Sequence, residues 1–320
     1  MLDKIIKLIS FVFFIAALFL IKKEVELVGV KKLVEIVQST PFLLILTSLI
    51  ITGINFVILS GYDLVGLSYI QKKLPYKKVL PMSSISFAIS NLTGHIYASG
   101  GAIRYLFLKP LGFTKKEIFL LISFETLTVL LGLAFAFVLA VFLETIDNTL
   151  KSYHYLSLLY LSAFLIIMGF LFYFEEIIKK GRSIWIGKIT LKAPSINQTY
   201  SGLLVGLSDF MTMFLIFYVF LDYFMDVSFI KVFIIFTTAM SLSYLSQVPA
   251  GIGVLESLFI ILFPHSTQEK GTILAAFALY RVIYFILPFF MAIAYLGINK
   301  IHQNKLKKLK IHKYTKKQTH

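Results

Sequence analysis

Long apolar runs separated by short polar loops recur along the whole chain of 320 residues. A helix needs about 20 predominantly apolar residues to cross the hydrocarbon core of a bilayer. Lysines follow the first run and no small-residue cleavage pattern does, so it is interpreted as an uncleaved anchor. The pattern predicts an all-α, polytopic membrane bundle with six full spans, at about 5–21, 42–61, 117–143, 153–174, 202–221 and 271–298.

Two further apolar segments, 79–108 and 229–264, are interrupted by Gly, Pro and polar residues. Unpaired backbone groups are very unfavourable in hydrocarbon, so a lipid-exposed helix should not contain such breaks. We therefore predict that both segments are broken or re-entrant helical hairpins, buried in protein or lining a wet cavity. Thr114 and Glu117 have the spacing of a capping box at the start of the span that follows the first hairpin.

Composition excludes several classes of function. Hydrophobic residues make up 58% of the chain and charged residues 15%, which is far from the balance of a soluble domain. Cysteine is absent, so neither a disulfide nor a thiolate is available. The net charge of +15 comes from lysines that flank apolar runs, and nucleic-acid binding is not predicted. No histidine spacing indicates a metal site, and no glycine-rich motif indicates a nucleotide or another cofactor.

The distribution of Lys and Arg predicts the orientation. If each hairpin returns to the side it entered, then the N-terminus, the loops 62–78, 109–116 and 175–201, and the tail share one face, which holds most of the 31 basic residues. By the positive-inside rule that face is cytoplasmic, so both termini are expected there. The basic tail, 299–320, is also suited to anionic lipid.

The order of these segments predicts an inverted repeat. Residues 1–143 contain two spans, an interrupted hairpin and a span, and residues 144–298 repeat that order from the opposite face. Short motifs agree, since Ser90-Asn-Leu-Thr followed by Gly100-Gly101 corresponds to Ser243-Tyr-Leu-Ser followed by Gly251. Inverted repeats with broken helices at the midplane are a transporter architecture.

Three stretches carry a family resemblance. They are Asn91–Arg104 followed by Glu125, the run Val248-Pro-Ala-Gly-Ile-Gly-Val-Leu-Glu256, and Tyr280-Arg281 followed by Tyr284 and Pro288. Over roughly 40–298 the chain resembles the flippase half of the bacterial lysylphosphatidylglycerol synthase/flippase (multiple peptide resistance factor) family. The resemblance implies a multi-pass protein of the bacterial inner membrane that translocates a phospholipid, anionic or aminoacylated. The two-domain members carry an aminoacyl-transferase domain, which is missing from this stand-alone form, so no enzyme activity is expected.

Charges inside the predicted membrane segments are the candidate chemistry, since each is expensive there and should face a partner or a cavity. Arg104 and Arg281 suit a lipid phosphate, because a guanidinium group binds it in a bidentate manner. Alternatively they form structural ion pairs with Glu125 and Glu256, which could otherwise receive an amine head group. The predicted substrate-binding residues are Asn91, Arg104, Glu125, Asp209, Pro249, Gly251, Gly253, Glu256, Arg281 and Tyr284.

Two acidic residues have a competing structural interpretation. Asp63 is predicted at the membrane interface, at the end of a span. Asp209 is as well explained by local hydrogen bonds from Ser208 and Thr212 as by a site. Three function classes stay open: lipid translocation, secondary transport of another hydrophobic anion or polyprenyl-linked intermediate, and a non-catalytic scaffold. A separate lipid-modifying enzyme and a second copy of the chain are the protein partners considered.

Overall fold

The computed structural model describes residues 35, 38–93, 99–147, 183–186, 189–192, 194–246, 251–263 and 267–299. The predicted spans at about 5–21 and 153–174, Pro249, and the tail beyond residue 299 lie outside these ranges. The described elements are α3 (Phe42–Tyr69), α4 (Tyr76–Thr93), α5 (Gly101–Leu108), the short 3-10 helix η2 (Lys109–Leu111), α6 (Lys115–Asp147), β1 (Ser183–Ile186), β2 (Ile189–Lys192), α8 (Ile196–Met225), α9 (Phe229–Ser246), α10 (Val254–Leu262), α11 (Thr267–Arg281) and the π-helix η4 (Val282–Ile286).

The all-α class is confirmed, apart from the short antiparallel hairpin β1–β2, which was not predicted. Among the described residues four helices are long and apolar enough to cross a membrane: Phe42–Tyr69, Lys115–Glu144, Ile196–Met225 and Lys270–Asn299. They correspond to four predicted spans. Caps explain where two of them begin, since Thr114 and Glu117 form the predicted capping box and Ser195 forms another with Gln198.

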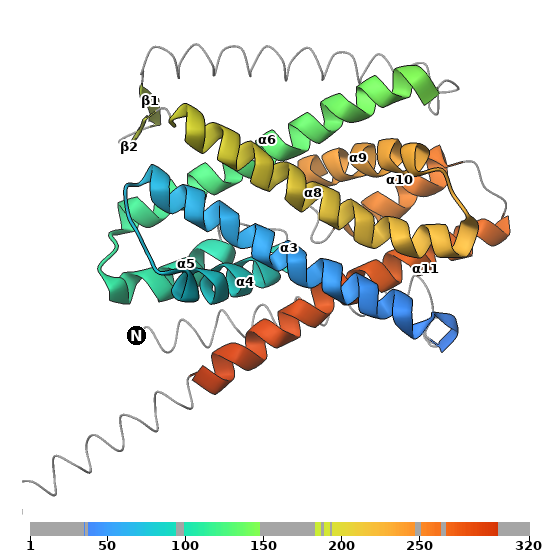
Figure 1. The fold of residues 1–320 in the computed structure, drawn as a ribbon, viewed down its shortest axis with the longest axis horizontal. Helices are drawn as coiled ribbons and strands as arrows, with labels where there is room; N and C mark the ends of the chain where they lie inside the picture. Colours follow the sequence, from blue (N-terminus) through green and yellow to red (C-terminus); the bar gives the residue numbers. More distant parts are fainter. Residues whose placement is uncertain are drawn as a thin grey trace, which may run out of the picture.

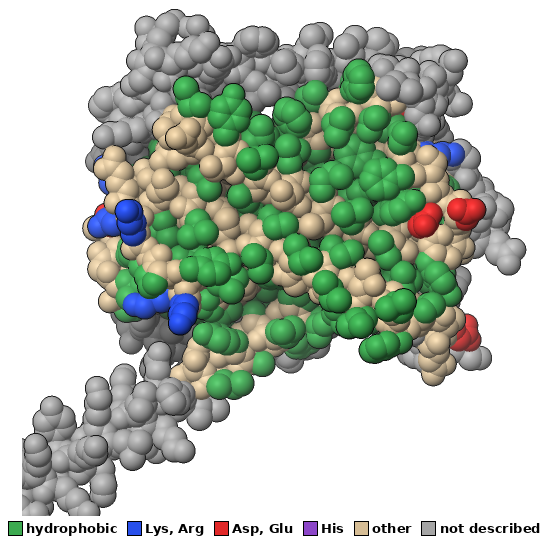
Figure 2. Space-filling model, in the orientation of Figure 1, with side chains coloured by type: hydrophobic (Ala, Val, Ile, Leu, Met, Phe, Trp, Pro, Cys, Tyr) green, Lys and Arg blue, Asp and Glu red, His purple; other side chains and the backbone are tan. Residues whose placement is uncertain are grey.

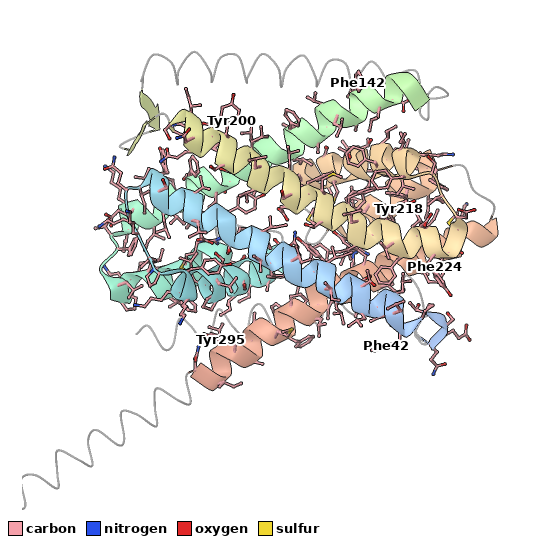
Figure 3. All side chains as sticks on the ribbon, in the orientation of Figure 1. Phe42, Phe142, Tyr200, Tyr218, Phe224 and Tyr295 are labelled. Carbon is pink, nitrogen blue, oxygen red and sulfur yellow. The ribbon has the colours of Figure 1, made fainter. Side chains whose placement is uncertain are left out.

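Helices α3 and α8 lie side by side and run in opposite directions (Figure 1). Three contacts fix this register: Ser68 with Gln198 near one end, Gly61 with Val205, and Asn55 with Asp209 near the middle. In Figure 3, Phe42 at the start of α3 and Phe224 at the end of α8 accordingly lie on the same side of the molecule. Opposite directions are what an inverted repeat requires, while the division into two repeats stays a prediction.

Each interrupted segment forms two helices that return to the side they entered. Lys72, after α3, forms an ion pair of 3.0 Å with Glu117 at the start of α6, so α4 and α5 begin and end at the same side. Lys231 near the start of α9 lies 5.0 Å from the ring centre of Phe263, just after α10. Figure 1 shows the two helix pairs at opposite ends of the bundle, α4–α5 where α3 finishes and α9–α10 where α8 finishes.

Glycines allow α6 and α8 to cross at very short range. A Cβ atom added to Gly132 would lie 2.5 Å from the backbone of Gly206, and one added to Gly202 would lie 2.8 Å from Thr128. Small residues four apart permit such close backbone approach, which is a common way for helices to associate in membranes. This crossing joins the long helices of the two halves of the chain.

The outer surface of the described bundle is largely apolar. Phe42, Ile50 and Phe142 are among many large hydrophobic side chains that are more than half exposed. Figure 2 shows hydrophobic side chains over the visible face, with Lys and Arg mostly at the side where α3 ends and Asp and Glu at the opposite side. An apolar belt between two charged rims is the surface expected of a protein that spans a bilayer.

Candidate functional site

The first buried cluster is centred on Arg104, in the first turn of α5. Its Nε donates to Asp63 Oδ1 and its Nη2 to Asp63 Oδ2, both at 2.8 Å. Glu125 from α6 accepts from Nε at 3.2 Å, and its second oxygen lies 3.0 Å from Nη2. All three side chains are shielded from solvent. Arg104 thus connects three elements, α3, α5 and α6.

The surroundings of Arg104 hold its guanidinium group in place. Ser83 on α4 donates a short hydrogen bond to Asp63, and the ring centre of Phe87 lies 4.8 Å from the guanidinium carbon. One donor atom is left over, because Arg104 Nη1 has no hydrogen-bond partner within the described residues. A Cβ atom added to Gly100 would lie 3.1 Å from Nη1, so a side chain at this position would crowd that donor.

The predicted position of Asp63 is wrong. It was placed at the membrane interface, yet it is fully buried within α3, which continues to Tyr69. The apolar pattern ends at Gly61 because Asp63 is unfavourable in a lone span, at about 2.5–3.5 kcal/mol at a helix centre. Pairing with Arg104 offsets that cost, and the pairing depends on a residue from another helix.

The second ion pair joins Arg281 at the end of α11 to Glu256 at the start of α10. The other Glu256 oxygen accepts from the backbone N–H of Gly253 at 2.8 Å. Gly251 and Gly253 have φ of +64° and +84°, a left-handed backbone conformation that side chains disfavour. A Cβ atom on Gly251 would also collide with the Ser243 hydroxyl. The two glycines thus interrupt the helix between α9 and α10, and Glu256 caps the start of α10 by accepting from the Gly253 backbone.

The two ion pairs occupy corresponding places with reversed charges. Gly101-Ala-Ile-Arg-Tyr-Leu-Phe107 opens α5, and Gly253-Val-Leu-Glu-Ser-Leu-Phe259 opens α10. The fourth residue of each run is buried and paired with the long helix that follows, Arg104 with Glu125 and Glu256 with Arg281. In each half, the tip of the hairpin is therefore fastened to the next long helix by a buried ion pair.

The third cluster lies between α3 and α8 and contains Asp209. Asn55 Nδ2 donates to Asp209 Oδ1 at 2.8 Å and to Thr212 Oγ1 at 2.7 Å. Tyr62 donates to Asp209 Oδ2 at 3.0 Å, and Tyr284 donates to Asn55 Oδ1 at 3.1 Å. The prediction that Ser208 and Thr212 satisfy the Asp209 carboxylate is wrong. The side chains that donate to this carboxylate are Asn55 and Tyr62, and both lie on α3.

The remaining predicted residues lie in different places. Asn91 is half-buried in α4 and belongs to none of the three clusters, and Pro249 falls outside the described residues. Sequence reasoning missed Asn55, Tyr62 and the role of Asp63. A polar residue in an otherwise apolar span was the available signal for Asn55 and Asp63, since such residues need partners. Tyr62 carried no signal, because tyrosines are common throughout the chain.

The buried charges do not balance. Within the described residues the buried basic side chains are Arg104 and Arg281, and the buried acidic side chains are Asp63, Glu125, Asp209 and Glu256. An excess of carboxylate in a medium of low dielectric has to be met by a proton or by another cation. Among the described residues, the buried carboxyl groups therefore outnumber the buried guanidinium groups by two.

These features define a class: a multi-pass α-helical membrane protein with two oppositely directed re-entrant hairpins and a polar, charged interior. The chain belongs to the family described as the lysylphosphatidylglycerol synthase TM region, whose profile matches residues 7–292. It is 27% identical to the inner membrane protein YbhN of Escherichia coli over 290 residues, which is 90% of each chain. It is 31% identical to the uncharacterized protein slr0712 of Synechocystis over 264 residues, covering 79% of this chain and 78% of the relative.

Proposed function

We propose that this protein translocates a phospholipid, or a related lipid-linked amphiphile, between the leaflets of the bacterial inner membrane, with both termini in the cytoplasm. One observation carries the proposal: Arg104, buried in the first turn of α5, has a donor nitrogen that no other described residue binds. A structural ion pair would have no use for that donor, whereas a phosphate oxygen would accept from it. The family membership supports a lipid as the substrate.

The surroundings of Arg104 suit a head group that carries both charges. Arg104 and the N-terminal end of α5 offer positive potential to a phosphate. Asp63 and Glu125 are the neighbouring carboxylates, and an amine on an aminoacylated lipid would compensate their excess negative charge. In this proposal the hairpins carry the lipid head group across the membrane. The acyl tails of the lipid stay in the bilayer, against the apolar outer surface of the protein (Figure 2).

Two other functions compete with this one. One is a secondary transporter for another hydrophobic anion or a polyprenyl-linked intermediate. Arg104 would bind the charged group of that substrate, which would have a different apolar tail. A non-catalytic scaffold would use the ion pairs for packing alone, and the buried Arg281–Glu256 pair is compatible with that role. In none of the three does the chain carry out aminoacyl transfer.

Reconstituted vesicles test the proposal. Vesicles of phosphatidylethanolamine and phosphatidylglycerol, with acyl-labelled phosphatidylglycerol as probe, report translocation when label in the outer leaflet is chemically quenched. Arg104→Lys keeps the charge but loses the planar fork, so translocation should fall about tenfold or more, as loss of ~1.5–3 kcal/mol in a charge-assisted contact implies. Lys116→Met, which removes an exposed charge at the start of α6, is the control and should leave the rate unchanged.

The outcomes separate the three functions. Wild-type rate in a well-folded Arg104→Lys variant would remove the arginine from the transport step. Failure of the wild-type protein to move labelled phosphatidylglycerol or an aminoacylated analogue, with movement of a labelled polyprenyl phosphate, would favour the second function. Failure with every amphiphile would favour the scaffold.

A further inference from the structure

Asp209 lies near the midpoint of a long membrane helix, α8. It is the fourteenth of the 30 residues of α8, and its partner Asn55 is the fourteenth of the 28 residues of α3. At 1.5 Å per residue, each is about 20 Å from either end of its helix. Within the described residues no Lys, Arg or His forms an ion pair with Asp209, which only the neutral groups of Asn55 and Tyr62 bind through its side chain. A carboxyl group so placed is a candidate functional group.

In the part of the chain that the structure describes, the titratable side chains facing Asp209 are phenols. They come from three directions: Tyr62 on α3, Tyr244 on α9, and Tyr280 and Tyr284 on α11 and η4. The nearest guanidinium in sequence to these tyrosines belongs to Arg281, which Glu256 already binds. Among the described residues, a negative charge on Asp209 is thus stabilised by hydrogen bonds and not by an ion pair.

The atoms around Asp209 suit a proton better than a metal cation. A sodium ion needs several oxygen ligands, yet Asn55 turns its NH₂ group toward the carboxylate, and its oxygen faces the Tyr284 hydroxyl. That orientation is required because an ionised carboxylate can only accept. The Tyr62 hydroxyl, in contrast, can donate or accept. A proton on Asp209 Oδ2 would reverse the Tyr62 hydrogen bond without moving either side chain.

A line of contacts leads from Asp209 to the second hairpin. Asn55 joins Asp209 to Tyr284, which stacks on Tyr280 with ring centres 5.6 Å apart. The buried Tyr280 hydroxyl has no hydrogen-bond partner within the described residues, and Tyr280 precedes Arg281, the partner of Glu256 in α10. Tyr284 itself lies in the π-helix η4, a local distortion that is frequent at functional sites. A change in the Asp209 cluster is thus connected to the ion pair that fastens the hairpin.

We infer that Asp209 is the proton-binding site through which a transmembrane proton gradient drives this protein; the inference rests on the proposed lipid translocation. A hydronium ion on one side of the membrane gives its proton to Asp209 Oδ2 and is left as water. Release to water on the other side restores the carboxylate. Protonation removes the negative charge from the carboxyl group that accepts from Asn55, and so weakens a charge-assisted hydrogen bond. Asn55 passes this change on to Tyr284, in the helix that carries the partner of Glu256.

Proton binding can be tested without any transport. Infrared difference spectra of the full chain in phosphatidylethanolamine/phosphatidylglycerol vesicles, taken between alkaline and mildly acidic buffer, report the carbonyl stretch of newly protonated carboxyl groups. We expect a component present in the wild-type protein and missing in Asp209→Asn. Asp226→Asn, at the exposed C-cap of the same helix, is the matched control and should keep it. Identical spectra for Asp209→Asn and the wild-type protein would overturn the proposal.

A second variant keeps the test valid if Asp209→Asn folds poorly. Tyr62→Phe retains the ring that packs on Phe87 but removes the donor to Asp209 Oδ2. The ionised carboxylate is then less stabilised, so the infrared component should appear at higher pH than in the wild-type protein. An unchanged or lower midpoint in a folded Tyr62→Phe variant would contradict the assignment.

Coupling is tested in the same vesicles with acyl-labelled phosphatidylglycerol and an imposed pH gradient. The wild-type protein and Asp226→Asn should accumulate label several-fold in one leaflet, and an ionophore that dissipates the gradient should abolish the accumulation. Asp209→Asn should only equalise the leaflets. Label movement by the wild-type protein that ignores the gradient would overturn the coupling while leaving translocation intact. If the wild-type protein moved no lipid but kept the infrared component, the proposed function would fail and the proton site would stand.

Discussion

Arg104 and Asp63 are 41 residues apart in the sequence and are joined by two parallel hydrogen bonds of 2.8 Å. Glu125 binds the same guanidinium group at the longer distances of 3.0 and 3.2 Å. The two carboxylates therefore contribute unequally, because the parallel, bidentate arrangement is the stronger one. Asp63, which the sequence pattern placed at the interface, is the principal partner of Arg104.

The unequal contributions predict an order of stability. Arg104→Met leaves two buried carboxylates without their cation and should lower the free energy of unfolding by about 3–5 kcal/mol. Asp63→Asn removes a charge-assisted pair and should cost about 1.5–3 kcal/mol, and Glu125→Gln should cost less. Thermal unfolding in detergent measures the order. A larger loss for Glu125→Gln than for Asp63→Asn would contradict it.

A double substitution can decide whether the Arg281–Glu256 pair serves packing or transport. Arg281→Met and Glu256→Met should each lower the folded yield, since each strands a buried charge at about 3–5 kcal/mol. The double variant should recover much of that loss, because it strands neither. Its translocation of labelled phosphatidylglycerol then decides the role of the pair. Wild-type transport by a well-folded double variant would show that these charges serve packing alone.

The crossing of α6 and α8 predicts a strong effect of a small substitution. Gly206→Ala brings a methyl group to 2.8 Å from the Gly132 backbone, which has no flexible side chain to move aside. We expect a loss of about 1–3 kcal/mol, typical of overpacking. Gly53→Ala on α3 is the control, since nothing lies within 4 Å of the added atom. Equal melting temperatures for the two variants would argue against the close crossing.

The two glycines of the second hairpin should differ in their tolerance. Both have a left-handed backbone, which costs roughly 1–2 kcal/mol for an alanine. Gly251→Ala adds a collision with the Ser243 hydroxyl, whereas Gly253 has open space around it. Gly253→Asn should therefore retain most of the folded yield and transport, and Gly251→Asn should lose both. The reverse order would mean that the break lies elsewhere.

Single cysteines can test the orientation, because the chain contains none. Asp226→Cys, exposed after α8, should react with an impermeant thiol reagent added to intact cells. Lys73→Cys, exposed at the opposite end after α3, should react only after the membrane is opened. The lysines around Lys73 place that end in the cytoplasm by the positive-inside rule. Labelling of Lys73→Cys in intact cells would reverse the proposed orientation.

The amino-acid pattern alone was sufficient for the membrane class, for four spans whose existence the structure confirms, and for two interrupted hairpins. These features depend on local properties: apolar length, the backbone requirements of Gly251 and Gly253, and the capping side chains of Thr114 and Glu117. Each of these features depends on a few consecutive residues. Only apolar runs are stable in hydrocarbon, and a backbone group without its helical hydrogen bond needs another partner close by. The two further spans and Pro249 lie outside the described residues and stay predictions.

Tertiary structure decided which polar residues meet. The sequence indicated that Arg104, Glu125, Glu256 and Arg281 needed partners, and the pairs Arg104–Glu125 and Arg281–Glu256 were among those considered. It did not indicate that Asp63 is the nearer partner of Arg104, or that Asn55 and Tyr62 bind Asp209 from another helix. A polar residue in a span shows only that some partner exists. The choice of partner depends on how α3, α6 and α8 cross. Contacts of glycines between segments that are distant in the sequence set these crossings.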